Sequence, residues 1–204
     1  DSGIPQVVFI GGEPTLRSDL VDLLSYTEQL GMVSGLLSAS PRLYQDPDYL
    51  DTLLDSGLDH LILEFDPESK QDLDLLKPIF DQDLFTCIRF PVHYHSESFA
   101  WTKELVAAGA NAFSFYAAEL DAHDQAAHLN HQLTNQGIHI EHDLPFPVYP
   151  GLSQQAKLFS PEVSVQEPAY YTVMPDGSLT PQDFPEHSLG SLINTDWHEL
   201  IVKL

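Results

Sequence analysis

Two glycines and a carboxylate follow a short apolar run near the start of the chain, at Gly11, Gly12 and Glu13. The apolar run predicts a buried strand, and Pro14 suits the first turn of a following helix, where its missing N–H is tolerated. Because glycines carry no side chain, the carbonyl oxygens at the strand's end can be approached closely. Carbonyl oxygens beside a carboxylate favour an ammonium ligand over a phosphate. From these four residues alone, an ordinary strand-to-helix turn is the simpler interpretation.

A longer stretch around these residues resembles the second-strand motif of the radical SAM enzymes. It reads Phe9-Ile10-Gly11-Gly12-Glu13-Pro14-Thr15-Leu16-Arg17 and then Asp19-Leu20. In that superfamily the motif holds the amino group of S-adenosylmethionine (SAM). The resemblance covers most of the chain. It implies an open β/α barrel and a SAM-binding role for Gly11, Gly12, Glu13 and Pro14.

The resemblance also places candidate ligands at the ends of later strands. The family usually has Thr-Asn-Gly after its third strand and a Ser-containing fourth strand that ends in Asp-Gly. Here Ser38-Ala39-Ser40 and Glu64-Phe65-Asp66-Pro67 stand at those places. The hydroxyl groups of Ser38 and Ser40 could still contact SAM, and Glu64 could accept hydrogen bonds from two ribose hydroxyls. A salt-bridged or solvated Glu64 is an equally good interpretation of this departure.

The family's defining Cys-x3-Cys-x2-Cys loop is missing from this sequence. Three thiolates of that loop bind a [4Fe–4S] cluster, whereas Cys87 is the only cysteine here and is interpreted as a small buried residue. The residues therefore predict neither a catalytic group nor a metal site of the family's kind. Because the chain begins at Asp1, directly before a strand, we expect an upstream segment to carry the first barrel strand and any cluster loop.

The end of the chain is similar to the auxiliary-cluster (SPASM) domain of peptide-modifying radical SAM enzymes. The similar residues are 171–181, 189–192 and 197–200. In that domain a cysteine follows the proline, whereas Gln182 stands at that place here. We therefore expect a degenerate SPASM-like extension without its iron–sulfur ligands.

Histidines offer a different metal chemistry. His93 and His95 share one face of a predicted strand end, as do His139 and Glu141 on another strand. If these ends met at a barrel mouth, the four side chains could bind Zn²⁺ or Fe²⁺. Polar lining of a cavity or plain surface positions are favoured over a metal site, and we expect His93 to line the same rim as Glu13.

Six strand-like runs alternate with helical patterns and predict parallel strands joined by helical crossovers. The runs begin near Gln6, Met32, His60, Phe85, Ala112 and Ile138. The helical patterns cover residues 16–30, 46–56, 68–80, 98–108 and 121–135. The predicted fold is α/β: an incomplete, open (β/α)6-type partial TIM barrel over residues 1–144, without its first strand. Prolines interrupt residues 145–204, which we expect to form an irregular extension with a hairpin at 170–179.

Composition limits the partners. The 204 residues carry a formal net charge of −23, which disfavours nucleic acid and anionic membranes. With 43% hydrophobic residues, the chain is globular. It contains neither an apolar run long enough to span a membrane nor a visible signal peptide, so a cytoplasmic protein is expected.

Two functions fit these features. The first is part of a SAM- and [4Fe–4S]-dependent oxidoreductase of the peptide-modifying type, whose cluster-binding segment lies outside this sequence. The second is a cluster-less, degenerate relative that acts as a non-catalytic binding or scaffold subunit. In the second case we expect a protein partner, or a second copy, along the sheet edge that the missing strand leaves open.

Overall fold

The computed structural model describes residues 4–65, 73–92, 98–117, 123–139, 171–181 and 187–201. The chain divides into two compact units, which are described separately. The first comprises residues 4–141, and the second comprises residues 142–204 with residues 1–3.

The first unit alternates strands with helices in chain order. Its strands are β1 (Gln6–Phe9), β2 (Val33–Ser38), β3 (His60–Glu64), β4 (Phe85–Val92) and β5 (Ala112–Ala117). Its α-helices are α1 (Leu20–Gln29), α2 (Arg42–Gln45), α3 (Pro47–Asp55), α4 (Lys77–Phe80), α5 (Ser98–Ala108) and α6 (His123–Thr134). Two 3-10 turns, η1 (Pro14–Leu16) and η3 (Leu73–Leu75), precede α1 and α4.

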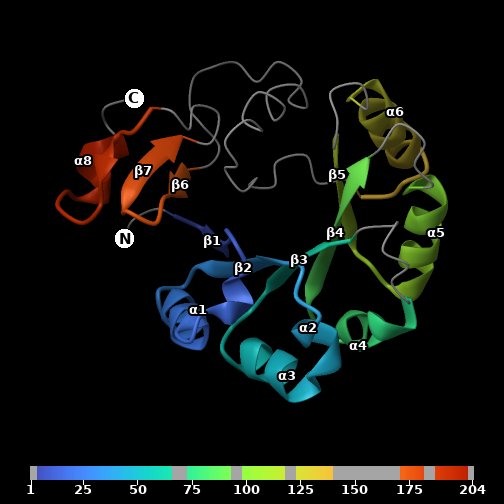
Figure 1. Ribbon diagram of the computed structural model, residues 1–204, viewed down its shortest axis with the longest axis horizontal. Helices are drawn as coiled ribbons and strands as arrows, with labels where there is room; N and C mark the ends of the chain where they lie inside the picture. Colours follow the sequence, from blue (N-terminus) through green and yellow to red (C-terminus); the bar gives the residue numbers. More distant parts are fainter. Residues whose placement is uncertain are drawn as a thin grey trace. The chain divides into compact units, whose positions relative to one another are not determined.

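The five strands form one parallel sheet in the order β1-β2-β3-β4-β5. Figure 1 shows that the sheet is curved and that helices α1, α3, α4 and α5 lie along its convex side. This α/β architecture is consistent with the predicted partial barrel. The predicted sixth strand lies mostly outside the described residues, although the Phe113 N–H donates to the His139 carbonyl oxygen at 3.0 Å.

The hydrophobic core lies between the sheet and its helices. Successive side chains of a strand point to opposite faces. Phe65 packs against Phe90, with ring centroids 5.2 Å apart, and against Trp101 of α5 at 5.4 Å. Phe65 and Phe90 therefore face the helices, and their neighbours Glu64 and Arg89 face the concave side of the sheet.

The first helix begins later than its sequence pattern indicates. The pattern predicts a helix from Leu16, but α1 starts at Leu20. Glu13 caps the 3-10 turn η1, and Arg17 then adopts an extended backbone with φ −73° and ψ 131°. The hydrogen bonds that Glu13 makes to this turn explain the break, because they fix Thr15 outside the helix.

The second unit is a small antiparallel sheet followed by a helix. It contains β6 (Tyr171–Val173), β7 (Ser178–Pro181), β8 (Gly190–Ser191) and α8 (Trp197–Ile201). The predicted hairpin is present, and the Ser178 N–H donates to Asp176 Oδ1 at 2.9 Å in its turn. Trp197 packs edge-on against Tyr171 at 5.3 Å. Gln182 lies outside the described residues, so the degenerate SPASM-like extension stays a prediction.

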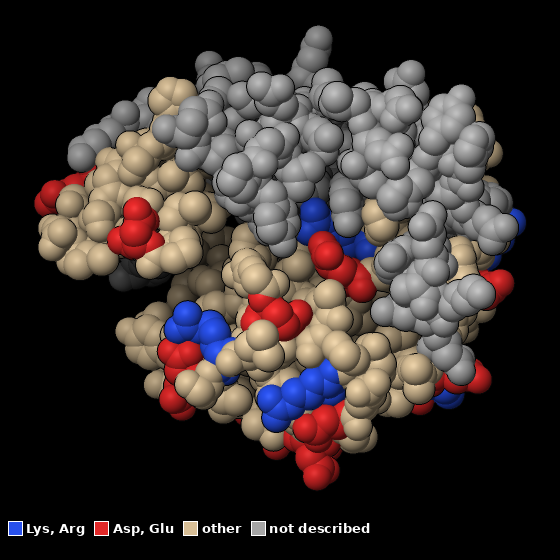
Figure 2. Space-filling view, in the orientation of Figure 1, with Lys and Arg blue, Asp and Glu red and all other residues tan. Residues whose placement is uncertain are grey.

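Charged side chains are mixed on the surface. Figure 2 shows acidic and basic groups side by side on the described part of the face in view. Three exposed ion pairs join residues that are close in the sequence: Arg17–Asp19, Arg42–Asp46 and Lys77–Asp81. Within the described ranges, the structure contains no helix with the length and apolar character needed to cross a membrane.

Candidate functional site

Glu13 connects the carboxyl ends of β1 and β2. Its Oε1 accepts hydrogen bonds from the Thr15 N–H at 3.0 Å, the Thr15 hydroxyl at 2.7 Å and the Ser38 hydroxyl at 2.7 Å. Its Oε2 accepts from the Ala39 N–H at 3.1 Å. A carboxylate offers about four acceptor positions, so these bonds use most of its capacity. Glu13 therefore fixes the shape of the loop, and what it offers a ligand directly is chiefly negative charge.

The same contacts keep Glu13 ionised. Partial burial raises the pKa of the Glu13 carboxyl group, but the hydrogen bonds from Thr15, Ser38 and Ala39 lower it by more. The net pKa lies below its ordinary value of 4.5. A negative charge is thus held at this edge of the sheet at neutral pH.

Gly11 and Gly12 leave open space beside Glu13. Both are exposed, with φ of +94° and +48°, a region that favours glycine. A Cβ atom added at either position would meet no atom within 4 Å. Among the hydrogen bonds of the described residues, none uses the carbonyl oxygen of Gly11 or Gly12. The sequence-based expectation that these carbonyls accept a donor from a ligand stays a prediction.

Pro14 and Tyr49 help to fix the conformation of the loop that follows β1. Pro14 is buried in the first turn of η1, so it shapes the loop rather than facing solvent. The Tyr49 hydroxyl donates to the Thr15 carbonyl oxygen at 3.4 Å, and the Arg42 guanidinium lies 3.5 Å over the Tyr49 ring. Burial raises the pKa of Tyr49, so this hydroxyl keeps its proton.

Ser38 and Ser40 form hydrogen bonds with neighbouring groups of the chain itself. Ser38 is 1% exposed, and besides donating to Glu13 its hydroxyl accepts from the Ser40 N–H at 3.0 Å. The Ser40 hydroxyl accepts from the Arg42 N–H at 3.3 Å. Both serines therefore lie at the predicted edge, and both hydroxyls have a partner there.

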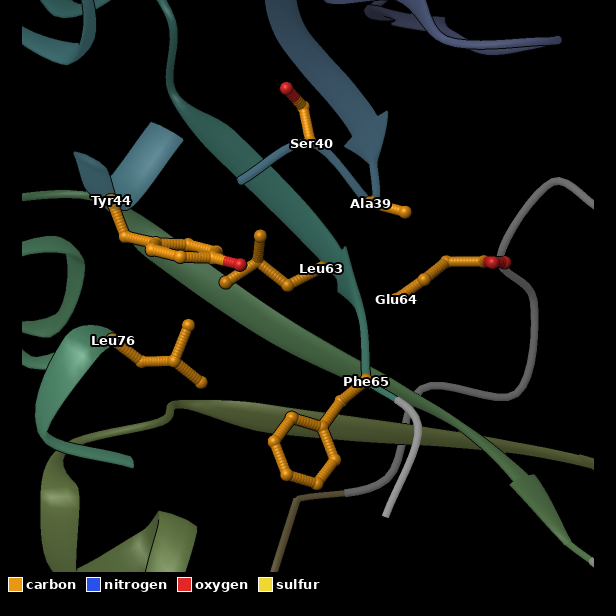
Figure 3. A pocket seen from close by; sticks show the side chains of 7 residues that line it. All are labelled: Ala39, Ser40, Tyr44, Leu63, Glu64, Phe65 and Leu76. Carbon is orange, nitrogen blue, oxygen red and sulfur yellow. The ribbon is translucent and has the colours of Figure 1, made fainter. Parts of the chain in front are cut away.

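Glu64 is paired with a buried arginine. Its Oε1 lies 3.1 Å from an Nη atom of Arg89, whose side chain is 4% exposed, while Glu64 is 34% exposed. The sequence left open whether Glu64 binds a ribose, forms a salt bridge or is solvated, and the structure contains a salt bridge. Glu64 also borders a shallow hollow of about 10 Å³, which is room for about one water molecule. Figure 3 shows the residues that line it: Ala39, Ser40, Tyr44, Leu63, Glu64, Phe65 and Leu76.

Sequence reasoning missed Arg89 and Tyr49. The signal for Arg89 was a single charged residue inside the apolar run of β4, but its partner depends on strand register. His93, His95, Glu141 and Asp66 lie outside the described residues. Within the described ranges, no group of three or more histidine, cysteine, aspartate or glutamate side chains could hold a metal ion. Cys87 is buried within β4.

The first unit is an α/β domain whose five-stranded parallel sheet is consistent with a partial α/β barrel, and polar side chains lie at the carboxyl ends of its strands. The chain is 43% identical over 63 residues to the PqqA peptide cyclase of Gluconobacter oxydans, which covers 31% of this chain and 17% of that protein. It is 38% identical over 63 residues to the PqqA peptide cyclase of Rhodopseudomonas palustris, covering 31% and 16%. A 7,8-dihydro-6-hydroxymethylpterin dimethyltransferase of Methanocaldococcus jannaschii is 34% identical over 67 residues, covering 33% and 13%.

These similarities support the radical SAM superfamily and a radical SAM-type function, over about a third of the chain. The matched stretch spans less than a fifth of each of these relatives. No family model matches the sequence.

Proposed function

We propose that this chain supplies the SAM-binding edge of a radical SAM oxidoreductase of the peptide-modifying type. The observation that carries the proposal is the open pair Gly11 and Gly12 beside the ionised Glu13, at the carboxyl end of β1. Ligands of parallel α/β sheets bind at this end of the strands. An ammonium group would lie against the two carbonyl oxygens, attracted by the Glu13 carboxylate.

Glu64 also lies at the carboxyl ends of the strands, as the last residue of β3, two strands from β1. Neighbouring strands lie about 4.8 Å apart, so the ends of β1 and β3 are roughly 10 Å from each other. SAM carries an ammonium group and a ribose diol on either side of a short chain that contains the sulfonium sulfur. In the proposed arrangement, Gly11 and Gly12 accept from the ammonium group and Glu64 accepts from the ribose hydroxyls.

The described residues do not fit a [4Fe–4S] cluster. Cys87, the one cysteine of the sequence, is 1% exposed in the middle of β4. No step is therefore assigned to a cluster on these residues. The proposal places the cluster ligands in a segment outside this sequence and assigns to this chain the binding and orientation of SAM.

Isothermal titration calorimetry tests the binding directly. We expect the 204-residue chain to bind SAM more tightly than 5′-methylthioadenosine, which lacks the ammonium group. Gly12→Ala should weaken SAM binding, because a methyl group would occupy the open space and the backbone would be strained. Equal affinities for the two compounds, or no binding of either, would refute the proposal.

Gly31→Ala is the matched control. Gly31 also has a positive φ, +72°, and a Cβ atom added there also meets no atom within 4 Å. It precedes β2 and so lies at the amino ends of the strands, opposite the proposed site. The two substitutions introduce similar backbone strain, but only Gly12→Ala should weaken SAM binding.

One observation favours the second function, a non-catalytic binding subunit. Within the described residues β1 pairs only with β2, which leaves the other side of β1 as a sheet edge that a second chain could extend. Iron–sulfur reconstitution of the complete gene product separates the two functions. A brown protein that cleaves SAM when reduced supports the enzyme, whereas an iron-free protein in a stable complex supports the binding subunit.

A further inference from the structure

A row of polar side chains crosses the concave face of the sheet. Glu64 of β3 is in register with Arg89 of β4, which is in register with Ser114 of β5. Their neighbours Phe65 and Phe90 pack together on the helix side, as do Phe113 and Phe115. The row therefore lies on the face opposite the hydrophobic core.

Exposure changes sharply along this row. Arg89 and Ser114 are 4% and 3% exposed, whereas the Glu64 side chain is 34% exposed. The Arg89 guanidinium is thus much less accessible to a ligand than the Glu64 carboxylate. Glu64 is one of the residues that line the hollow, and Figure 3 shows its side chain extending from β3 away from Tyr44 and Leu76.

The pairing leaves acceptor positions on Glu64. Its Oε1 is 3.1 Å from Arg89, and no hydrogen bond among the described residues uses its Oε2. A carboxylate oxygen that is not already hydrogen-bonded accepts hydrogen bonds from neutral donors such as hydroxyl groups. Because the ion pair with Arg89 restricts the Glu64 side chain, less conformational entropy is lost when a ligand binds.

We propose that Arg89 is a positioning residue, which holds the Glu64 carboxylate in the orientation that selects a neutral vicinal diol, and that it does not contact the ligand. This inference rests on the proposed function, because it names the group of SAM that the paired carboxylate recognises. The buried cation also explains why a carboxylate is tolerated directly after the apolar residues 61–63 of β3.

Nucleosides with and without the diol test the inference. The probes are adenosine and 2′-deoxyadenosine, titrated into the 204-residue chain by calorimetry or by NMR. We expect the wild-type chain to prefer adenosine about tenfold, the effect of one hydrogen bond to a charged acceptor. Arg89→Met should reduce this preference to near unity while leaving the affinity for 2′-deoxyadenosine unchanged, and Arg89→Lys should restore part of it.

Two further variants distinguish a specific loss of the preference from misfolding of the chain. Glu64→Gln keeps the size of the side chain and should also lose the preference, whereas Ser114→Ala, a buried change in the same row, should keep it. If Arg89→Met weakens both nucleosides equally, the arginine is only structural and the inference is wrong. If it weakens SAM but neither nucleoside, Arg89 contacts the amino-acid end of SAM, which also overturns the inference.

The outcomes separate this inference from the proposed function. A wild-type chain that binds SAM and both nucleosides without preferring the diol refutes the role of Glu64 and Arg89 alone. A wild-type chain that binds neither SAM nor either nucleoside refutes the proposed function, and the inference with it.

Discussion

Replacement of Glu13 by alanine should destabilise the first unit measurably. The substitution removes the cap of η1, and loss of a side-chain cap costs about 1 kcal/mol. It also removes the acceptor of the buried Ser38 hydroxyl, and a buried donor without its acceptor costs about 1–3 kcal/mol. Because Glu13 is only partly buried, water can replace some of these contacts. We therefore expect a loss of about 2–3 kcal/mol in the free energy of unfolding.

Tryptophan fluorescence during urea unfolding measures this loss. The chain has two tryptophans, so Trp197→Phe leaves Trp101, which contacts Phe65 in the first unit, as the sole tryptophan reporter. Asp46→Ala is the control: Asp46 Oδ1 accepts from the Tyr49 N–H at 3.2 Å as the cap of α3, and its Oδ2 forms an exposed ion pair with Arg42 at 3.4 Å. The control should cost about 1 kcal/mol. A Glu13→Ala variant no less stable than Asp46→Ala would refute the role assigned to Glu13.

The pH dependence gives a second check on Glu13. Its pKa is lower in the folded chain than its ordinary value of 4.5, so ionised Glu13 stabilises the folded state. This contribution is fully present above 4.5 and is lost as the pH falls through the lowered value. The stability difference between wild type and Glu13→Gln should therefore shrink as the pH falls below 4.5. A difference independent of pH would show that the charge of Glu13 contributes nothing.

Three further predictions use the same unfolding assay. Leu53→Ala removes a fully buried side chain of α3 and should cost about 2–5 kcal/mol; a loss below that of Asp46→Ala would contradict the packing. Gly57→Ala combines a φ of +94° with a Cβ atom only 2.8 Å from the Glu28 Cβ, so it should cost about 1–3 kcal/mol and more than Gly31→Ala. Arg17→Ala breaks an exposed ion pair with Asp19 and should leave the unfolding midpoint unchanged; a clear shift would mean that the pair holds the loop.

The alternation of strands and helices could be predicted from the sequence, because it depends on local patterns. The observed strands start at or within one residue of the predictions for Gln6, Met32, His60, Phe85 and Ala112. The boundary of α1 was wrong, because the competing interaction involves a side chain outside the helical pattern. Periodicity alone cannot show that Glu13 binds the Thr15 amide and hydroxyl.

The site was harder to predict, because its contacts join residues far apart in the chain. The sequence pointed to Gly11, Gly12 and Glu13, and the structure leaves the two glycines open. It could not show that Ser38 and Ala39 already bind the Glu13 carboxylate, because those contacts depend on how β1 and β2 pair. The Glu64–Arg89 pair likewise depends on the register of β3 and β4.

The most direct test of the SAM-binding edge is an amide chemical-shift map of the 204-residue chain titrated with SAM. We expect perturbations at the carboxyl ends of β1, β2 and β3, centred on Gly12, Ala39 and Phe65. We expect none at Gly31 or Leu58, which lie at the amino ends of the strands. Absence of perturbations, or perturbations centred on the amino ends, would contradict SAM binding at the carboxyl ends.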